Sequence, residues 1–166
     1  IWREKPFKII EKYAEWAKAY QEDQVTVVYD TMWNGTKAIA HAIEAEIKKQ
    51  SPSTVVKVFH IAKSDKNEVM TEVFKSKAIA VGSPTAINDI LASVTAWMSF
   101  AKSLKFKNKK AAAFGCYGWS GEGVAVLQKE LKEAGFDVVD ENVKSLWNPG
   151  EEDFAKVPEL VKALLA

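Results

Sequence analysis

Three consecutive segments of the chain read Val25-Thr-Val-Val-Tyr-Asp30, Thr31-Met-Trp-Asn-Gly-Thr36 and then Lys37 to Lys49. The first is a short run rich in β-branched residues, which predicts a buried strand. The third places apolar residues three or four positions apart, which predicts a helix packed by one face. The loop between them leaves free backbone N–H groups at the helix start. Together with the helix dipole, these groups favour an anion such as phosphate.

The loop from Thr31 to Thr36 lacks the common nucleotide-binding signatures. No Gly-Lys-Ser/Thr follows it, so it is not a Walker A loop, and the pattern G-x-G-x-x-G is absent. Two hydroxyls and the loop amides, with no Lys or Arg in the loop, suit a terminal monophosphate. A threonine before a helix is also an ordinary N-cap, so the loop alone leaves both interpretations open.

Length and composition favour one folded domain. The chain has 166 residues, of which 48% are apolar, and its formal net charge of +1 gives no drive toward nucleic acid or a membrane. The single cysteine, Cys116, excludes an internal disulfide and fits a reducing compartment. No run of 18 apolar residues and no signal-peptide pattern is present, so we expect a soluble cytoplasmic protein. Because it starts at Ile1, we expect a processed product or an excised domain.

Short apolar runs alternate with amphipathic segments along the chain. We expect strands at residues 25–30, 54–60, 78–82, 110–115 and 136–139. We expect helices between and after them, with starts at Lys37, Asp65, Asn88 and Glu151 and one more through Val124 and Leu131. This alternation predicts an α/β fold with one parallel sheet and helices on both faces. Right-handed crossovers then favour a flavodoxin-like, doubly wound, five-stranded sheet in the order 2-1-3-4-5.

Three residues mark helix ends in this pattern. Asp65 begins a capping-box pattern, and Gly135 marks a C-terminal stop. Pro6 suits the first turn of an amphipathic helix of about four turns that precedes the first strand. We therefore divide the chain into a linker segment with an extra N-terminal helix, residues 1–24, and a flavodoxin-like domain, residues 25–166.

The topology predicts where a ligand binds. In an open parallel sheet, ligands lie beyond the carboxyl ends of the strands, where the strand order reverses. The loops 31–36, 83–88 and 116–121 converge there, and they carry hydroxyl groups and the aromatic residues Trp33 and Trp119. A phosphate cradle beside aromatic walls suits a flat ring on a phosphorylated tail. FMN has this shape, and so does a nucleoside monophosphate.

The usual catalytic sets are missing from the sequence. His41 and His60 are isolated, and no cluster of His, Cys and acidic residues has metal-ligand spacing. Cys116 belongs to no Cys-x-x-Cys motif, which favours a small buried side chain over a redox thiol. Asp30 could pair locally or bind Mg²⁺, but the further acidic residues of a receiver domain are absent. We therefore expect no catalytic residue and no metal ligand.

Three motifs carry a resemblance to a known family. Tyr29-Asp-Thr-Met-Trp-Asn-Gly-Thr36, Val81-Gly-Ser-Pro-Thr85 and Tyr117-Gly-Trp-Ser-Gly121 resemble the flavin domain of A-type flavoproteins, the flavodiiron proteins. The likeness covers nearly the whole chain and keeps the order and spacing of all three loops. The segment from Ile1 to Trp16 is similar to the stretch that joins the diiron domain of that family to its flavin domain.

The resemblance implies a cofactor, FMN, and a set of residues that contact it. The implied contacts are Thr31, Met32, Trp33, Asn34, Gly35 and Thr36 for the phosphate, Pro84, Thr85 and Asn88 for the ribityl chain and one side of the ring, and Cys116, Tyr117, Gly118, Trp119 and Gly121 for the other side. The chain departs from the family pattern at Ile87, Ala92 and Cys116, where the family pattern has Asn, Pro and Ser. These departures put one hydrogen bond to the flavin in doubt.

The resemblance also implies a role. Such a domain would pass electrons from FMN to a metallo-β-lactamase-like diiron domain, absent from this chain, that reduces O₂ or NO. The implied donor is a small redox protein such as rubredoxin, or a reductase, and the implied parent is a homodimer or homotetramer. We expect the chain alone to bind FMN and transfer electrons without reducing O₂ or NO itself.

Other functions remain open from the sequence. A freestanding flavodoxin shares the fold, but such carriers are commonly strongly acidic, which fits a net charge of +1 poorly. A non-redox binding module with an empty or nucleotide-filled pocket would also show this pattern. A quinone or flavin reductase that uses NAD(P)H is the remaining alternative, although the sequence shows no separate nicotinamide motif.

Overall fold

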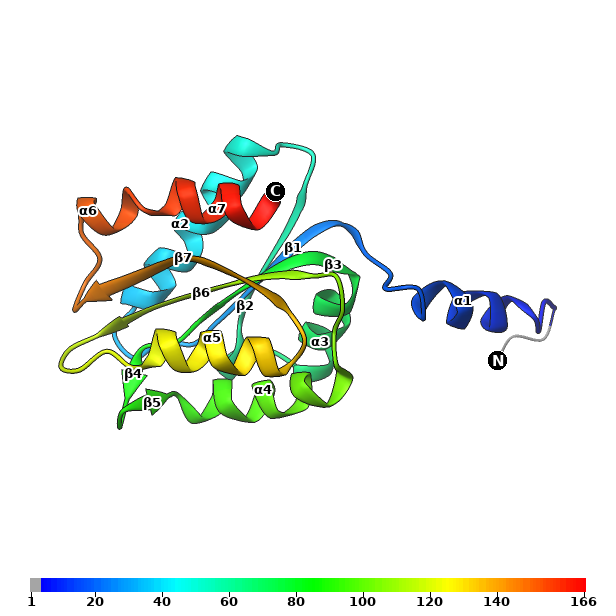
Figure 1. The fold of residues 1–166 in the computed structure, drawn as a ribbon, viewed down its shortest axis with the longest axis horizontal. Helices are drawn as coiled ribbons and strands as arrows, with labels where there is room; N and C mark the ends of the chain where they lie inside the picture. Colours follow the sequence, from blue (N-terminus) through cyan, green and yellow to red (C-terminus); the bar gives the residue numbers. More distant parts are fainter. Residues whose placement is uncertain (1–3) are drawn as a thin grey trace.

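A computed structural model describes residues 4–166, and its centre is a parallel sheet (Figure 1). The strands of this sheet are β1 (Glu22–Tyr29), β2 (Val55–His60), β3 (Ser76–Gly82), β6 (Lys110–Tyr117) and β7 (Asp137–Leu146). Their order is β2-β1-β3-β6-β7, and every pair is parallel. The predicted doubly wound order 2-1-3-4-5 is therefore confirmed.

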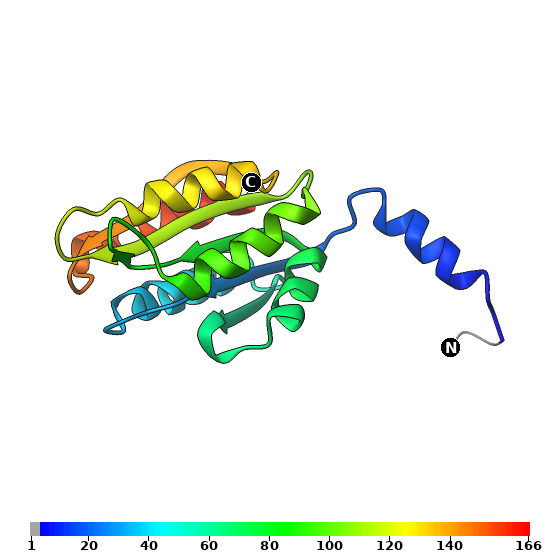
Figure 2. The ribbon, with the colours of Figure 1, turned by 90° about the horizontal axis from the view of Figure 1, so that it is seen from below.

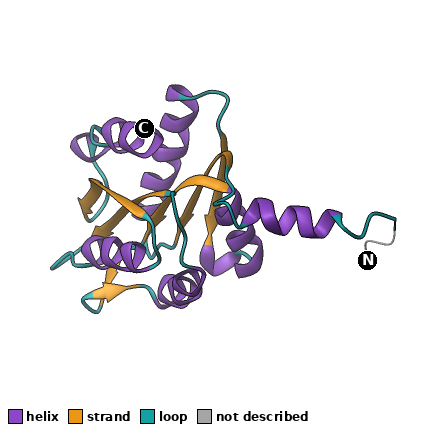
Figure 3. Ribbon diagram, turned by 45° about the vertical axis from the view of Figure 1, so that its right-hand side comes forward, coloured by secondary structure: helices purple, strands orange, loops and turns teal. Residues whose placement is uncertain are grey.

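Helices cover both faces of the sheet, as the ribbon coloured by secondary structure shows (Figure 3). One layer consists of α2 (Gly35–Gln50) and α7 (Val157–Leu165), and the other consists of α3 (Lys66–Lys75), α4 (Ala92–Leu104) and α5 (Gly123–Glu133). Two short helices, η1 (Ile61–Lys63) and α6 (Glu151–Phe154), lie in the connections. This arrangement is the three-layer solution that a sheet apolar on both faces requires.

Alternation along the strands divides the core in two. Val25 and Val27 of β1 pack with the layer of α2 and α7, whereas Val28 packs with the layer of α3, α4 and α5. Successive side chains of a strand point to opposite faces, so a strand covered on both sides reads as a continuous apolar run. The run from Ala111 to Ala113 in β6 is fully buried for this reason.

The predicted helix boundaries at Asp65 and Gly135 are confirmed. The Asp65 carboxylate accepts hydrogen bonds from the backbone N–H groups of Asn67 (2.9 Å) and Glu68 (3.0 Å), which would otherwise lack partners. Gly135 has a φ of +96°, and its N–H donates to the carbonyl oxygen of Lys132 at 3.0 Å. Such a left-handed residue ends a helix at little cost when it is glycine.

The prediction that a helix begins at Asn88 is wrong. A small antiparallel ribbon, β4 (Thr85–Ala86) and β5 (Asp89–Ile90), occupies this segment, and α4 begins at Ala92. Ile87 and Asn88 form its turn with φ values of +54° and +57°. Two adjacent left-handed residues make the tight turn that a two-residue hairpin loop needs. Asn88 tolerates this conformation, whereas Ile87 gives no signal for it in the sequence.

The last strand and the last helix also differ from the sequence expectation. The predicted strand at 136–139 extends to Leu146 in the structure, with a register shift against β6 between Ala111 and Ala113. The single helix expected from Glu151 is divided into α6 and α7, and Pro158 lies in the first turn of α7. The longer strand carries the chain to the same edge of the sheet as the three predicted loops.

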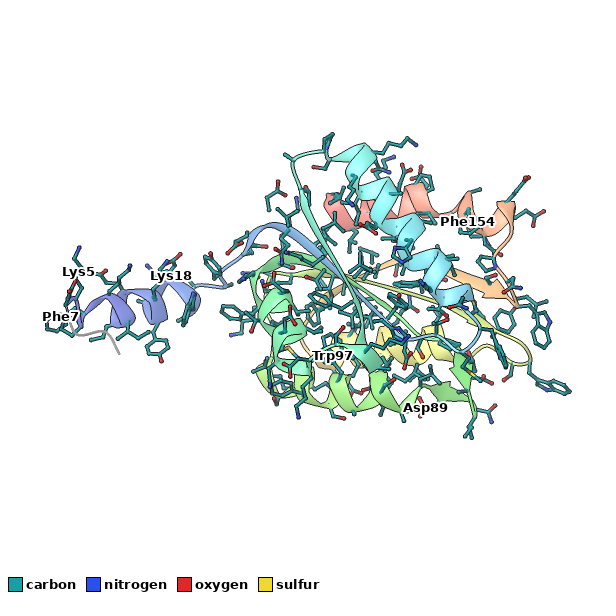
Figure 4. All side chains as sticks on the ribbon, turned by 180° about the vertical axis from the view of Figure 1, so that it is seen from behind. Lys5, Phe7, Lys18, Asp89, Trp97 and Phe154 are labelled. Carbon is teal, nitrogen blue, oxygen red and sulfur yellow. The ribbon has the colours of Figure 1, made fainter. Side chains whose placement is uncertain are left out.

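The N-terminal helix, α1 (Lys8–Trp16), projects from the domain in two perpendicular views (Figures 1 and 2). It has nine residues rather than the expected four turns, and none of them is buried. Figure 4 labels Phe7 at the outer end of this segment and Lys18 nearer the sheet. β1 begins at Glu22, two residues before the end of the predicted linker segment. The division of the chain into a linker and a domain at residue 24 remains a prediction.

Candidate functional site

The loops that follow β1, β3 and β6 meet at one edge of the sheet and enclose a cavity of about 760 Å³. A volume of this size is typical of small-molecule sites. Eleven of the fourteen residues selected from the sequence line the cavity, namely Thr31, Met32, Trp33, Gly35, Thr36, Thr85, Asn88, Cys116, Tyr117, Gly118 and Trp119. The predicted convergence of the three loops is therefore confirmed, while contact with FMN stays a prediction for each residue.

Three of the selected residues do not line the cavity. Asn34 caps the start of α2 from an exposed left-handed position with a φ of +66°, and Pro84 is buried in the second loop. Gly121 is buried at a φ of +80°, where a Cβ would lie 2.5 Å from the Lys144 side chain. These residues shape the loops from positions outside the cavity lining.

Four lining residues were not selected from the sequence: Ile87, Ser120, Trp147 and Asn148. Trp147 follows β7, and its N–H donates to the carbonyl oxygen of Tyr117 at 2.7 Å. The unpredicted length of β7 therefore brings a fourth loop to the cavity. Val143 and Ser145 alternate with more exposed neighbours in the folded strand, but Ser145 is polar, so the sequence itself shows no apolar alternation there.

Two buried hydroxyl groups mark the polar end of the cavity. The side-chain oxygens of Thr31 and Thr36 have no hydrogen-bond partner among residues 4–166. Buried polar atoms are nearly always paired, and leaving one unpaired costs about 1–3 kcal/mol. Both threonines lie beside the start of α2, whose first N–H groups have no partner within the helix. A phosphate would satisfy both sets of donors.

Gly35 is required where α2 begins. A Cβ at this position would lie 2.9 Å from the Cys116 sulfur atom and 3.2 Å from the carbonyl oxygen of Trp147. The missing side chain lets the loops after β6 and β7 approach the helix start closely. The polar end of the cavity is therefore narrow and is enclosed by backbone.

Aromatic side chains also line the cavity. Trp33, Trp119 and Trp147 have 81%, 95% and 68% of their surface exposed, and Tyr117 is half-buried. Side chains this apolar are seldom left so open unless a ligand or partner covers them. The ring of Trp147 also packs against Gly118, where a Cβ would touch it at 3.0 Å. A flat aromatic ligand would fit between such walls.

Hydrogen bonds fix the second and third loops to each other. The Thr85 hydroxyl accepts a hydrogen bond from the N–H of Gly123 at 3.0 Å, so its position is set by the start of α5. The Ser120 hydroxyl donates to a carboxylate oxygen of Glu122 at 2.7 Å, and the side-chain oxygen of Asn88 lies 3.3 Å from the same hydroxyl. These contacts join the segments after β3 and β6.

The residues that line the cavity carry no charged side chain. An anion held here would depend on hydroxyls, amides and the dipole of α2. Burial raises the pKa of the Cys116 thiol, although the neighbouring Thr36 hydroxyl acts against this. A neutral thiol is a poor nucleophile, so Cys116 lines the site without a reactive role. It is also a weak hydrogen-bonding group, so it leaves the Thr36 hydroxyl without a strong partner.

The described part of the chain has neither a cluster of metal-binding side chains nor a helix that could cross a membrane. Residues 4–166 contain no group of three or more His, Cys, Asp or Glu side chains that could hold a metal ion. Within the same residues, no helix combines the length and the apolar character that crossing a membrane requires.

Comparison with known proteins identifies the family. The model of the family described as Flavodoxin matches residues 27–163. The chain belongs to the flavodoxin family. An anaerobic nitric oxide reductase flavorubredoxin from Aeromonas hydrophila is 43% identical to this flavodoxin domain over 159 residues. That match covers 96% of the chain and 32% of the relative, so the chain spans about a third of the relative's length.

Solved structures agree with this assignment of the flavodoxin domain. The rubredoxin oxygen:oxidoreductase of Desulfovibrio gigas has a TM-score of 0.89 at 30% identity, and the match covers 94% of this chain and 38% of that one. The flavodiiron protein of Giardia intestinalis has a TM-score of 0.83 at 29% identity, with 94% and 40% covered. A flavodoxin from the domain Archaea has a TM-score of 0.73 at 30% identity, with 86% and 96% covered. The resemblance to the flavin domain of flavodiiron proteins is thus confirmed.

FMN is the cofactor of this flavodoxin domain. The residues present fit it on the geometry alone, because the unpaired hydroxyls of Thr31 and Thr36 supply donors for a phosphate. The aromatic side chains that line the same cavity supply apolar surface for an isoalloxazine ring.

Proposed function

We propose that this chain is the FMN-binding electron-transfer domain of a flavodiiron protein. It accepts electrons from a small redox protein such as rubredoxin, or from a reductase, and delivers them to a diiron domain in the same polypeptide. The observation that carries the proposal is the pair of unpaired buried hydroxyls below an uncharged, aromatic-walled cavity. The length of the flavorubredoxin relative, about three times that of the chain, supports a further domain in the parent protein.

Each part of the cavity has a role in this function. The hydroxyls of Thr31 and Thr36 and the first amides of α2 bind the phosphate, while Thr85 and Asn88 orient the ribityl chain. Tyr117, Trp119 and Trp147 hold the ring and keep water from its faces. When bound, FMN supplies one- and two-electron transfer, and the surrounding protein sets its potentials.

The rim of the cavity suits electron exchange with a partner. Trp33, Ile87 and Trp119 are 81%, 99% and 95% exposed, and together they form an apolar border around the opening. Exposed apolar groups of this kind are typical of docking sites. We propose that this border faces the diiron site in an assembled homodimer or homotetramer, and that the protein acts in the cytoplasm.

A freestanding flavodoxin is the alternative that one comparison favours. The archaeal flavodoxin is matched over 96% of its length by 86% of this chain. A match over nearly the whole length of a flavodoxin requires no longer parent. The N-terminal segment and the net charge of +1 favour the domain of a larger protein.

The experiment that tests the cofactor is a visible absorption spectrum of the purified chain before and after addition of FMN and desalting. We expect retained yellow flavin that acid releases and mass spectrometry identifies as FMN. The bound flavin should then be reduced by reduced rubredoxin without any NADH. A chain that stays colourless at saturating FMN would overturn the electron-transfer function.

The coding sequence upstream of Ile1 distinguishes a domain of a flavodiiron protein from a freestanding flavodoxin. The reading frame upstream of Ile1 is expected to encode a metallo-β-lactamase-like domain in continuous sequence. A start codon directly before Ile1 and a yellow, reducible chain would instead establish the freestanding carrier.

A further inference from the structure

A buried carboxylate lies at the base of the phosphate loop, outside the cavity lining. Asp30 follows β1 directly and is 7% exposed. It accepts hydrogen bonds from the N–H of Thr31 at 2.7 Å, from Nε2 of His60 at 2.8 Å and from the Ser93 hydroxyl. The local pairing that the sequence left open for Asp30 is therefore the arrangement found.

The three donors come from three separate parts of the fold. Thr31 begins the loop, His60 is the last residue of β2, and Ser93 lies in the first turn of α4. The ring of His60 is itself held by stacking on Tyr29, with centroids 5.2 Å apart and an interplanar angle of 15°. Asp30 also donates its own N–H to the carbonyl oxygen at the end of β3 at 3.0 Å. The carboxylate thus joins the loop to β2 and α4, and the backbone N–H of the same residue joins it to β3.

The bond to Thr31 has a consequence for ligand binding. Because the Thr31 N–H is already engaged by Asp30, the polar atom that Thr31 can still offer an anion is its hydroxyl. That hydroxyl is buried and unpaired, as is the hydroxyl of Thr36 at the other end of the loop. Both must point to the same place if one phosphate is to satisfy them.

We propose that Asp30, oriented by His60 and Ser93, is the positioning residue that aligns the Thr31 hydroxyl with Thr36 for the phosphate of FMN. This inference rests on the proposed function and deepens it. Asp30 does not contact the cofactor and acts through Thr31. The phosphate end of FMN therefore depends on Asp30, while the ring end does not.

Position rather than charge is the property that matters at this site. Burial alone would raise the pKa of Asp30, but the hydrogen bonds from Ser93, Thr31 and His60 outweigh it, so the pKa lies below its ordinary value. An ionised group beside a phosphate gives no attraction, so the benefit must come from geometry. An asparagine could still accept from the Thr31 and His60 N–H groups through its oxygen, and its amide group could donate to the Ser93 oxygen.

The test compares FMN with riboflavin, which lacks the phosphate. Dissociation constants of both are measured by titration of flavin fluorescence against the wild-type chain, Asp30→Ala, Asp30→Asn and Ser93→Ala. For Asp30→Ala we expect FMN affinity to fall about tenfold or more and riboflavin affinity to stay within about twofold. Asp30→Asn should keep FMN affinity within about threefold, which is the rescue expected of a geometric role.

Two matched variants serve as controls. Asp23→Asn removes a carboxylate from the other end of β1, where Asp23 pairs with Lys77 at 2.7 Å. Ser99→Ala removes a hydroxyl of α4 that bonds only to the carbonyl oxygen of Thr95 at 3.0 Å. Neither should change FMN affinity, whereas Ser93→Ala should lower it about two- to fivefold. If Asp30→Ala does not fold, the contrast between Ser93→Ala and Ser99→Ala decides the question.

The ³¹P NMR signal of bound FMN gives a readout that loss of stability would not produce. In the Asp30→Ala and Ser93→Ala variants we expect the chemical shift to move toward that of free FMN, while both controls keep the wild-type value. Equal losses for FMN and riboflavin, or an unchanged ³¹P shift, would overturn the positioning role. A wild-type chain that binds no FMN would overturn the proposed function instead, so the two failures are distinct.

Discussion

The two ends of the sheet differ in how their buried polar groups are paired. At the amino ends of the strands, the buried ammonium of Lys109 donates three hydrogen bonds. At the carboxyl ends, the buried hydroxyls of Thr31 and Thr36 have no hydrogen-bond partner within residues 4–166. Both ends bury polar atoms away from water. A buried polar atom without a hydrogen bond lowers the free energy of unfolding by about 1–3 kcal/mol. Satisfied groups at one end stabilise the fold, and unsatisfied groups at the other end indicate where a ligand binds.

The satisfied end is built around Lys109, which is 3% exposed. Its acceptors are carbonyl oxygens from three segments: Tyr20 before β1 at 2.9 Å, Phe74 in α3 at 2.9 Å and Ser76 in β3 at 2.5 Å. An ammonium has three donors, so all of them are used. Gln24 adds a bond to the Ser76 hydroxyl at 3.1 Å. This cluster leaves no donor for a ligand.

Replacing Lys109 with Met should have the largest effect on stability. Three buried carbonyl oxygens lose their donor, and we expect the free energy of unfolding to fall by about 3 kcal/mol, measured by urea denaturation. FMN affinity should stay within about twofold, because the cavity lies at the opposite edge of the sheet.

Lys110→Met is the matched control for this variant. Lys110 donates to one carbonyl oxygen, that of Ala163, at 3.0 Å and is less buried, so its loss should cost about 1 kcal/mol or less. Equal costs for the two variants would contradict a special role for the Lys109 cluster.

Thr36→Val should have the opposite signature. Without cofactor the variant should be as stable as the wild type or more stable, because a buried hydroxyl without a partner is removed. FMN binding should weaken by about 1–3 kcal/mol, since a phosphate contact is lost. Isothermal titration and thermal unfolding of the cofactor-free protein measure the two effects.

Thr26→Val makes the same change where the hydroxyl is satisfied. Thr26 is fully buried in β1, and its hydroxyl lies 2.8 Å from that of Ser76. Here we expect stability to fall by about 1 kcal/mol and FMN affinity to stay the same. If both threonine variants behaved alike, the distinction between the two ends of the sheet would be lost.

The pH dependence of stability sharpens the comparison further. Burial lowers the pKa of Lys109 from 10.5 to about 8. Between these values the unfolded chain binds more protons at this group than the folded chain, so its contribution to the free energy of unfolding rises with pH. The difference between wild type and Lys109→Met should therefore grow by about 1–2 kcal/mol from pH 7.5 to pH 10. A difference that stays flat or shrinks over this range would contradict the buried charge.

The sequence predicted the frame of the molecule and the approximate place of the site. Buried parallel strands read as apolar runs, so the strand order and the loops after β1, β3 and β6 followed from pattern alone. The end of β7 could not be predicted, because Asp140 and Glu141 resemble loop residues and only pairing with β6 extends the strand past them. Trp147 was missed for the same reason.

The partners of polar side chains were also beyond the sequence. Nothing local distinguishes Thr36, which has no partner, from Thr26, which has one, because the difference depends on contacts with residues far along the chain. Lys109 likewise reads as one of several lysines before a strand. Its burial follows from the place where the segment before β1 crosses the amino ends of β3 and β6.

Removing α1 should have the smallest effect on stability, and comparison with a further deletion locates the edge of the satisfied end. A chain that begins at Ala19 loses α1, which buries no residue, and the ring contact of Trp16 with Phe74 at 6.1 Å. We expect a cost of about 1 kcal/mol or less by urea denaturation. A chain that begins at Val25 also loses the Tyr20 carbonyl oxygen that Lys109 contacts and the first residues of β1, so it should be less stable by several kcal/mol or fail to fold. Equal stability of the two shortened chains would move the domain boundary to residue 24 and would show that Lys109 does not require its contact with the N-terminal segment.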